Sequence, residues 1–204
     1  MCGRFVKRVG PGDRLKDKRI GIIVANEFED VELLYPFIRL SEEGAEIIII
    51  AVRAGLHPRP AVENKPITGR FGTPIPLEVF REGERYVVKN LGEVRAEDLD
   101  ALIIPGGFSP DALRIREDVL NFVKEMHAKN KIIAAICHGP QVLISAGLVK
   151  GRRCTSYEAV RDDLINAGAE FVDEPAVRDG NLITARVPDD LPEFCQLIID
   201  ALSS

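Results

Sequence analysis

The sequence has few cysteines and few histidines, and neither residue type is grouped. The chain contains no C-x-x-C pair and no Cys/His cluster with the spacing of a zinc finger; its cysteines are Cys2, Cys137, Cys154 and Cys195. This spacing argues against a structural zinc site. We therefore predict a protein without a metal ion or another cofactor.

Long hydrophobic runs are also absent. No stretch of 18 apolar residues occurs, and the first residues contain no hydrophobic core of a signal peptide. We therefore expect neither a transmembrane helix nor a membrane partner. Unpaired cysteines are typical of a reducing compartment, so we expect the protein to be cytoplasmic.

The charges are divided unevenly along the 204 residues. The formal net charge is −5, yet residues 1–19 contain seven Lys/Arg and two Asp, a net charge of +5. An acidic total argues against a general nucleic-acid-binding protein. With 46% hydrophobic and 29% charged residues, the composition is that of a globular protein. We predict a basic N-terminal extension over residues 1–18 and a single domain over residues 19–204.

Hydrophobic periodicity indicates strands that alternate with helices. Short apolar runs predict buried strands at 19–25, 45–52, 100–105 and 131–136, and helical spacing predicts helices at 31–43, 112–129, 139–146, 157–167 and 189–202. Residues 176–185 have the pattern of a hairpin that turns at Asp179-Gly180. The prediction is an α/β fold: a doubly wound, mostly parallel sheet in a three-layer α/β/α sandwich. Residues 56–93, rich in proline, interrupt this pattern and predict an inserted hairpin.

The strongest chemical signal is the segment Ala135-Ile136-Cys137-His138-Gly139. A buried strand runs into a nucleophilic residue flanked by small residues, and a helix follows. This is the strand–turn–helix context of a nucleophile elbow, with Cys in place of Ser. A helix N-terminus favours thiolate over thiol, so we expect a reactive Cys137 whose pKa is lowered.

A nucleophilic cysteine needs a base and hydrogen-bond donors for the oxyanion. His138 is the histidine next to Cys137, and none follows it. Four carboxylates follow the first strand, and one of them beside Cys137 could carry protons; they are Glu27, Glu29, Asp30 and Glu32. Gly106-Gly107 has two alternative roles. Either its backbone N–H groups form an oxyanion hole together with the His138 N–H, or the two glycines only form a tight turn.

Several motifs together resemble the ThiJ/PfpI superfamily, most closely its intracellular protease I branch, whose members are also described as protein deglycases. The matching segments are Ala25-Asn26-Glu27-Phe28-Glu29-Asp30-Val31-Glu32-Leu33, Pro105-Gly106-Gly107, Ala135-Ile136-Cys137-His138-Gly139-Pro140-Gln141 and Thr155-Ser156-Tyr157. The resemblance covers about residues 19–202. It implies a flavodoxin-like fold, shared with class I glutamine amidotransferases, and a homo-oligomer such as a trimer or hexamer. The late His-x-Glu segment of those amidotransferases is missing, which argues against glutamine hydrolysis.

The resemblance also implies roles for individual residues. Cys137 is the nucleophile, His138 its partner, and Glu29 the carboxyl group that contacts the thiol. Backbone N–H groups of Gly107 and His138 form the oxyanion hole. An acidic residue from a neighbouring subunit, at the position of Asp111, orients His138. The substrate pocket includes Gly106, Phe108 and Pro140.

The sequence departs from that branch in three places. Residues 56–93 are similar to an insert of plant members with glyoxalase activity. Asp111 replaces a longer Glu, and Phe108 stands where a basic residue is frequent.

Three functions follow from this site. The first is carbonyl chemistry, in which the Cys137 thiolate adds to a small carbonyl compound such as methylglyoxal or to a glycated protein, with Glu29 as proton shuttle. The second is an intracellular cysteine peptidase that acts on peptides. The third is a redox-sensing or chaperone role in a stress response. We favour the first, because it demands less of His138 than amide cleavage does.

Overall fold

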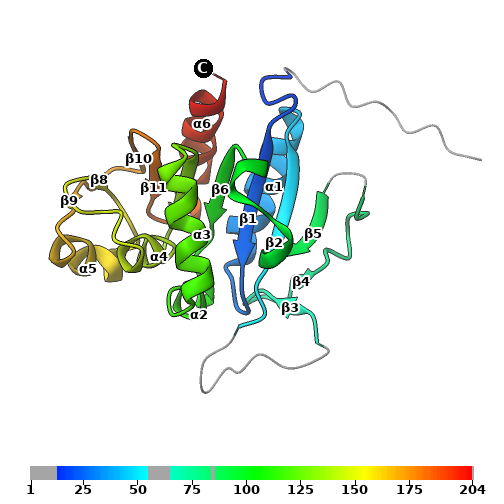
Figure 1. Ribbon diagram of the computed structural model, residues 1–204, viewed down its shortest axis with the longest axis horizontal. Coiled ribbons are helices and arrows are strands. Elements are labelled where there is room, and N and C mark those ends of the chain that lie inside the picture. The colour runs from blue at the N-terminus through cyan, green and yellow to red at the C-terminus, as the bar shows by residue number, and fades with distance from the viewer. Residues whose placement is uncertain (1–12, 55–64, 84–85, 204) are drawn as a thin grey trace, which may run out of the picture.

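The computed structural model describes residues 13–54, 65–83 and 86–203, and a seven-stranded sheet runs through this part of the chain (Figure 1). The strand order is β10-β11-β7-β6-β1-β2-β5. The strands are β1 (Arg19–Val24), β2 (Glu46–Ala51), β5 (Tyr86–Asn90), β6 (Ala101–Ile104), β7 (Ile132–Ile136), β10 (Ala176–Asp179) and β11 (Leu182–Ala185). All neighbours pair in parallel except β10, which is antiparallel to β11. The predicted mostly parallel α/β sheet is therefore confirmed.

The apolar runs form the central strands because both faces of a parallel sheet are covered. In β1 and β2 the register pairs Ile20 with Ile47 and Ile22 with Ile49, and all four side chains are fully buried. All four residues of β6 and all five of β7 are buried as well.

Helices pack on both faces of the sheet. The α-helices are α1 (Asp30–Glu42), α2 (Ser109–Leu113), α3 (Glu117–Ala128), α4 (Pro140–Ser145), α5 (Arg161–Asn166) and α6 (Leu191–Leu202). Short 3-10 turns lie at η1 (Leu91–Glu93), η2 (Ala96–Asp98), η3 (Glu158–Val160) and η4 (Pro188–Asp190). Two small strand pairs, β3 (Ile67–Thr68) with β4 (Pro74–Ile75) and β8 (Arg153–Cys154) with β9 (Glu170–Phe171), lie outside the main sheet.

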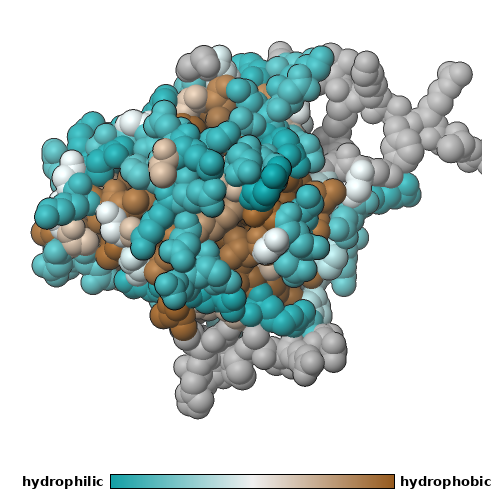
Figure 2. Space-filling view, in the orientation of Figure 1, coloured by the Kyte–Doolittle hydropathy of each residue, from teal (hydrophilic) through white to brown (hydrophobic). Residues whose placement is uncertain are grey.

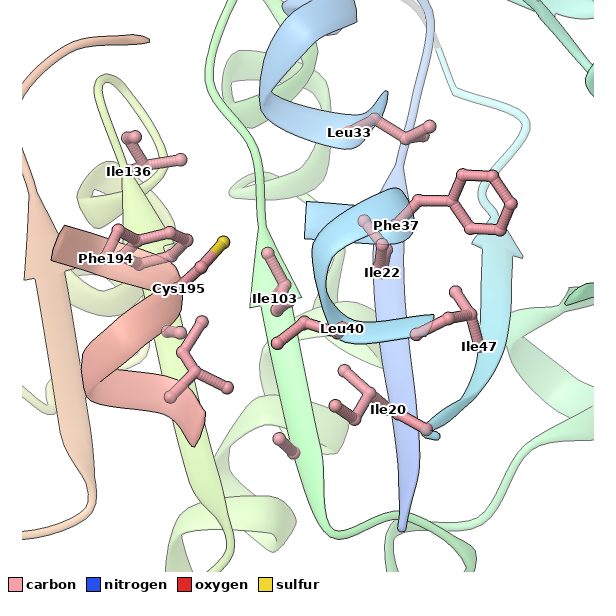
Figure 3. Packing of buried hydrophobic residues seen from close by; sticks show 14 of the residues in the cluster. Ile20, Ile22, Leu33, Phe37, Leu40, Ile47, Ile103, Ile136, Phe194 and Cys195 are labelled. Atoms are coloured by element: carbon pink, nitrogen blue, oxygen red, sulfur yellow. The ribbon is translucent and has the colours of Figure 1, made fainter. Parts of the chain in front are cut away.

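One hydrophobic cluster fills the space between the sheet and helices α1 and α6. Figure 3 shows Leu33, Phe37 and Leu40 of α1 beside Ile20 and Ile22 of β1, with Phe194 and Cys195 of α6 farther along the sheet. Cys195 is therefore a core residue, as its place on the apolar face of the last predicted helix indicated.

A second cluster lies on the opposite face, where α3 and α4 pack against the sheet. Figure 2 shows hydrophobic residues at the surface beside α3, on the side of β2 and η1. Partly buried residues that pack against this cluster include Val87, Leu91 and Leu120. Subunit contacts often cover such surfaces. The homo-oligomer implied by the resemblance stays a prediction.

The sequence predicts one helix over residues 112–129, and the structure divides it in two. Helix α2 ends at Leu113 and α3 begins at Glu117, because Arg116 adopts an extended backbone (φ −95°, ψ 117°). The Arg114 side chain donates a hydrogen bond to Ser145 at 3.0 Å, which fixes the connection against α4.

The segment that the sequence analysis assigned to an inserted hairpin divides into two parts. β3 and β4 form an antiparallel pair, so a small hairpin is present. Residues 86–90, however, form β5, which pairs in parallel with β2 at the edge of the main sheet. The predicted inserted hairpin therefore does not include residues 86–90, whose alternating pattern serves an edge strand of the core sheet equally well. His57 lies outside the described residues.

The described part of the N-terminal extension is attached to the domain. Leu15 is fully buried in the α1–α6 cluster, and its N–H donates to the Glu43 carbonyl at 2.8 Å. The buried Glu43 carboxylate pairs with Arg14 and with Arg39, both at 2.7 Å. Hydrogen bonding from Arg14, above all, lowers the pKa of Glu43 to about 2. Residues 13–18 thus pack as part of the domain, while residues 1–12 lie outside the described part.

We predict that Glu43→Gln destabilises the fold by about 1–2 kcal/mol at pH 7, because both arginines lose a charged partner. The lowered pKa means that the carboxylate stabilises the fold above about pH 4.5, and that this stabilisation is lost as the pH falls toward 2. Urea unfolding should therefore show a smaller difference between wild type and variant at pH 3 than at pH 7. Glu42→Gln, at the exposed neighbouring position, is the control; an equal effect of both variants would contradict the role of Glu43.

Candidate active site

Cys137 lies in a strained turn directly after β7. Its backbone has a φ of 61°, a conformation uncommon for a residue with a side chain. The Gly139 N–H donates to the Ile136 carbonyl at 2.8 Å and closes the turn, and α4 begins at Pro140. A Cβ on Gly139 would collide with the Ile104 carbonyl oxygen, so only glycine fits there. The strand–turn–helix geometry predicted around Cys137 is confirmed, while its role as a nucleophile stays a prediction.

The thiol of Cys137 is surrounded by polar groups although only 8% of the residue is exposed. The His138 Nδ1 atom lies 3.2 Å from Sγ. The backbone N–H groups of His138 and Gly107 donate hydrogen bonds to the sulfur. The two predicted oxyanion-hole donors therefore converge on the Cys137 sulfur, while their role in a reaction stays a prediction.

A fully buried carboxyl group, that of Glu32 in the first turn of α1, completes the surroundings of the thiol. Its Oε2 atom accepts a hydrogen bond from the Gly106 N–H at 2.6 Å. Its Oε1 atom has no hydrogen-bond partner among the described residues. A Cβ on Gly106 would lie 2.8 Å from the Cys137 Cβ and 2.9 Å from Glu32 Oε2, so the glycine allows the three residues to meet.

Burial changes the protonation of both groups. It raises the pKa of Glu32 to about 7, which keeps the carboxyl group protonated up to neutral pH. Burial, together with the charge of Glu32, also raises the pKa of the Cys137 thiol to about 12. The backbone N–H groups of His138 and Gly107 lower the pKa of the thiol, as expected, while burial acts against them. Since each negative charge opposes the other, the pair holds at least one proton near neutral pH.

The prediction that Glu29 contacts the thiol is wrong. Glu29 is the N-cap residue of α1, and its carboxylate accepts a hydrogen bond from Arg70 at 2.7 Å. Glu32 occupies the predicted place, one helical turn farther on. The sequence contained a signal for this: Glu32 shares a helical stripe with Pro36 and Leu40, which are both buried.

His138 lies beside an aromatic ring, and a carboxylate of the same chain acts on it. The ring of Tyr157 is 4.9 Å away, centroid to centroid. Burial lowers the pKa of His138, and the carboxylate of Asp111 acts in the opposite direction. Asp111 thus acts electrostatically on His138 of its own chain. Its predicted contact from a neighbouring subunit stays a prediction.

The residues predicted to line a substrate pocket differ in exposure, and their role stays a prediction. Gly106 and Pro140 are buried, and Phe108 is 40% exposed. The guanidinium of Arg70 lies 5.3 Å from the centre of the Phe108 ring. Arg70 was not among the predicted site residues, because its segment has no periodic pattern that places it beside residues 27–32.

No group of three or more His, Cys, Asp or Glu side chains in the described ranges is arranged to hold a metal ion. Within the same ranges, no helix has the length and hydrophobicity needed to cross a bilayer. The absence of a cofactor stays a prediction.

Comparison with known proteins identifies the family. The DJ-1/PfpI family description matches residues 18–201. The chain belongs to the DJ-1/PfpI family. It is 42% identical to a protein from Pyrococcus abyssi named a deglycase and to Deglycase PfpI from Pyrococcus furiosus, in each case over 88% of this chain and 99% of the relative. It is also 40% identical to YraA of Bacillus subtilis, which is named provisionally as a cysteine protease, over 87% and 94% of the two chains.

Solved structures of the family share the fold. A two-domain protein from Anabaena variabilis, with a DJ-1/ThiJ/PfpI-like and a ferritin-like domain, has a TM-score of 0.77 and 34% identity. That match covers 91% of this chain and 48% of the other. Drosophila melanogaster DJ-1beta has a TM-score of 0.73 and 25% identity, over 91% and 90%. The flavodoxin-like sandwich expected from the sequence is thereby confirmed.

The buried carboxyl group of Glu32 predicts a stability difference that depends on pH. The pKa of Glu32 in the folded state, about 7, lies above the ordinary value of 4.5. The contribution of Glu32 to the free energy of unfolding is therefore fully present below pH 4.5 and is lost as the pH rises through 7. Glu32→Gln should therefore gain stability relative to wild type between pH 5 and pH 8, by up to roughly 3 kcal/mol. Urea unfolding measures this gain, with Glu42→Gln as the control. No gain for Glu32→Gln would contradict a raised pKa.

Proposed function

We propose that this protein is a cysteine-dependent deglycase that acts on reactive carbonyl compounds and on their adducts with amines. The observation that carries the proposal is the pair of Cys137 and the buried Glu32, whose raised pKa suits a group that accepts and returns a proton near neutral pH. Relatives at 42% identity that are named deglycases support it.

The first step forms a bond between the Cys137 sulfur and the aldehyde carbon of a 2-oxoaldehyde. The pair of Glu32 and Cys137 reacts when it carries one proton: the carboxylate accepts the thiol proton as sulfur attacks, and the aldehyde oxygen is protonated to give a hemithioacetal. In an amine adduct, sulfur displaces the amine from the same carbon, and the amine leaves with the proton. The N–H groups of Gly107 and His138 stabilise negative charge on the substrate oxygen.

The second step moves a proton from the former aldehyde carbon to the neighbouring carbonyl carbon. The first carbon is thereby oxidised and the second reduced within one molecule, so no external oxidant is needed. Glu32 carries this proton. Water then breaks the C–S bond of the resulting 2-hydroxyacyl thioester, which restores the thiol and releases a 2-hydroxy acid.

We predict that methylglyoxal is converted to lactate by the wild type and not by Cys137→Ala. The measurement is an assay of lactate in a buffer without amines, since amines consume the aldehyde. Release of free N-acetylarginine from its methylglyoxal adduct is the second readout. Cys195→Ala, which removes a thiol of the core, should retain activity wherever it folds. Equal rates for wild type and Cys137→Ala would exclude the proposed function.

The pH profile tests the role of Glu32. The reactive pair loses its first proton near pH 7, so kcat/KM of the wild type should rise through this pH. In Glu32→Gln the rate should fall by about 10²–10⁴-fold, as expected for loss of a general acid–base group. Its remaining rate should rise only at higher pH, because burial still raises the pKa of the thiol. A profile identical to that of wild type would show that Glu32 carries no proton in the reaction.

A peptidase is the second candidate function, favoured by the contact between His138 Nδ1 and the Cys137 sulfur and by the name of the Bacillus subtilis relative. Amide cleavage requires His138 to become an imidazolium that protonates the leaving amine. Burial lowers the pKa of His138 and disfavours that cation. We therefore place carbonyl chemistry first. Release of a fluorogenic group from peptides by wild type but not by Cys137→Ala, without lactate formation, would reverse this order.

A redox sensor requires a thiol that is readily ionised. Burial opposes ionisation of Cys137, so this third role stays a prediction of lower rank. Mass spectrometry after mild peroxide would support it if Cys137 gains oxygen before the core residue Cys195 does.

A further inference from the structure

The turn between β3 and β4 is docked on the loop that connects β1 to α1. The carboxylate of Asp30 accepts hydrogen bonds from the N–H groups of Phe71 and Thr73, at 2.9 and 2.8 Å. Backbone hydrogen bonds join Glu27 N–H to Thr68 at 2.7 Å and Arg70 N–H to Phe28 at 3.0 Å. The position of this turn relative to α1 is therefore fixed by hydrogen bonds from both sides.

The docked turn carries Arg70 to the edge of the active site. The Arg70 guanidinium lies 5.6 Å from the ring centre of Phe71 and 5.3 Å from that of Phe108. Phe108 directly follows Gly107, whose N–H donates to the Cys137 sulfur. The positive charge of Arg70 also acts on His138 and on Glu32.

Most of the N–H donors of Arg70 have no partner within the described ranges. Its Nη1 donates to Glu29 at 2.7 Å, and its other N–H groups form no hydrogen bond with a described residue. The side chain is 41% exposed, so a ligand can reach it. A guanidinium presents five N–H groups in a planar fork and binds two oxygen acceptors at once, which suits carboxylates and neighbouring oxygen atoms.

We propose that Arg70 is a specificity-determining residue that binds an oxygen-bearing, negatively charged group next to the carbon attacked by Cys137. The inference rests on the proposed function, in which the second carbonyl of a 2-oxoaldehyde adjoins that carbon and its oxygen gains negative charge while the proton moves between the two carbons. Arg70 then selects vicinal dicarbonyl compounds and their adducts over simple aldehydes. Glu29 holds the guanidinium in place, and its negative charge partly offsets the positive charge of Arg70.

Alkylation of Cys137 by iodoacetate and by iodoacetamide tests this without any enzymatic assay. In both reagents the thiolate attacks the same CH₂ group and displaces iodide, but iodoacetate carries a carboxylate beside the reacting carbon. Arg70→Met keeps the apolar length of the side chain and removes the charge. The ratio of the iodoacetate rate to the iodoacetamide rate at Cys137, followed by mass spectrometry, should fall about tenfold in this variant.

Two further variants sharpen the result. Arg70→Lys keeps the charge without the planar fork and should give an intermediate ratio. Glu29→Gln leaves Arg70 unneutralised and should raise the ratio above that of wild type. Arg95→Met, which removes a cation from the exposed turn at η2, is the control for net charge and should leave the ratio unchanged.

The outcomes separate this proposal from the proposed function. A lower ratio in Arg70→Met supports anion recognition even if no lactate is formed. An unchanged ratio in folded Arg70→Met overturns the role of Arg70, while lactate formation by wild type would still support a deglycase. An equal fall of the ratio in Arg95→Met would also overturn it, because the effect would then come from net charge alone.

Discussion

The backbone of Cys137 is held in a conformation that an isolated chain avoids, and the active site depends on this constraint. A positive φ at a residue with a side chain costs on the order of 1–3 kcal/mol, so the surrounding structure must impose it. Hydrogen bonds from the Cys137 N–H to the Ala185 carbonyl and from the Tyr157 N–H to the Cys137 carbonyl, each at 3.0 Å, hold the residue from two sides. The sharp turn points the thiol toward the carboxyl end of the sheet instead of continuing the strand.

The neighbouring segments are adapted to the same turn. Gly139 allows the chain to pass the Ile104 carbonyl, and Gly106 allows the Glu32 carboxyl group to approach the Cys137 side chain. The site thus brings together the ends of β1, β6 and β7, where parallel strands place ligand-binding residues in α/β folds. This arrangement buries the Glu32 carboxyl group, and burial disfavours its charged form. The pair of Glu32 and Cys137 therefore shares a proton near neutral pH.

Carboxylates near this centre have different surroundings and hence different chemistry. Glu32 is fully buried, with one oxygen bound to a backbone N–H and the other without a partner in the described chain. Glu29 pairs with Arg70. Asp30 binds two backbone N–H groups of the neighbouring turn. A buried carboxyl group with a raised pKa, a partner for a cation and a structural anchor therefore lie together within residues 29–32.

Elements that depend on a local pattern can be predicted from the amino-acid sequence alone. Apolar runs specify the buried strands β1, β2, β6 and β7, and a nucleophilic residue between a buried strand and small residues specifies the elbow at Cys137. The hairpin of β10 and β11 follows from its Asp-Gly turn. These features were predictable because strand burial, turn geometry and glycine requirements act over a few residues.

Contacts between residues that are distant in the sequence, in contrast, are defined only by the folded chain. Glu32 and Glu29 are three residues apart, and the packing of α1 on the sheet determines that Glu32 faces the thiol while Glu29 faces Arg70. The edge strand β5 is recognisable only from its pairing with β2, and Arg70 reaches the site only because Asp30 anchors its turn. The thiol pKa, likewise, follows from burial and from the charge of Glu32, which no local pattern contains. Contacts between segments far apart in the chain depend on the complete packing of the fold, and therefore lie beyond the reach of sequence periodicity.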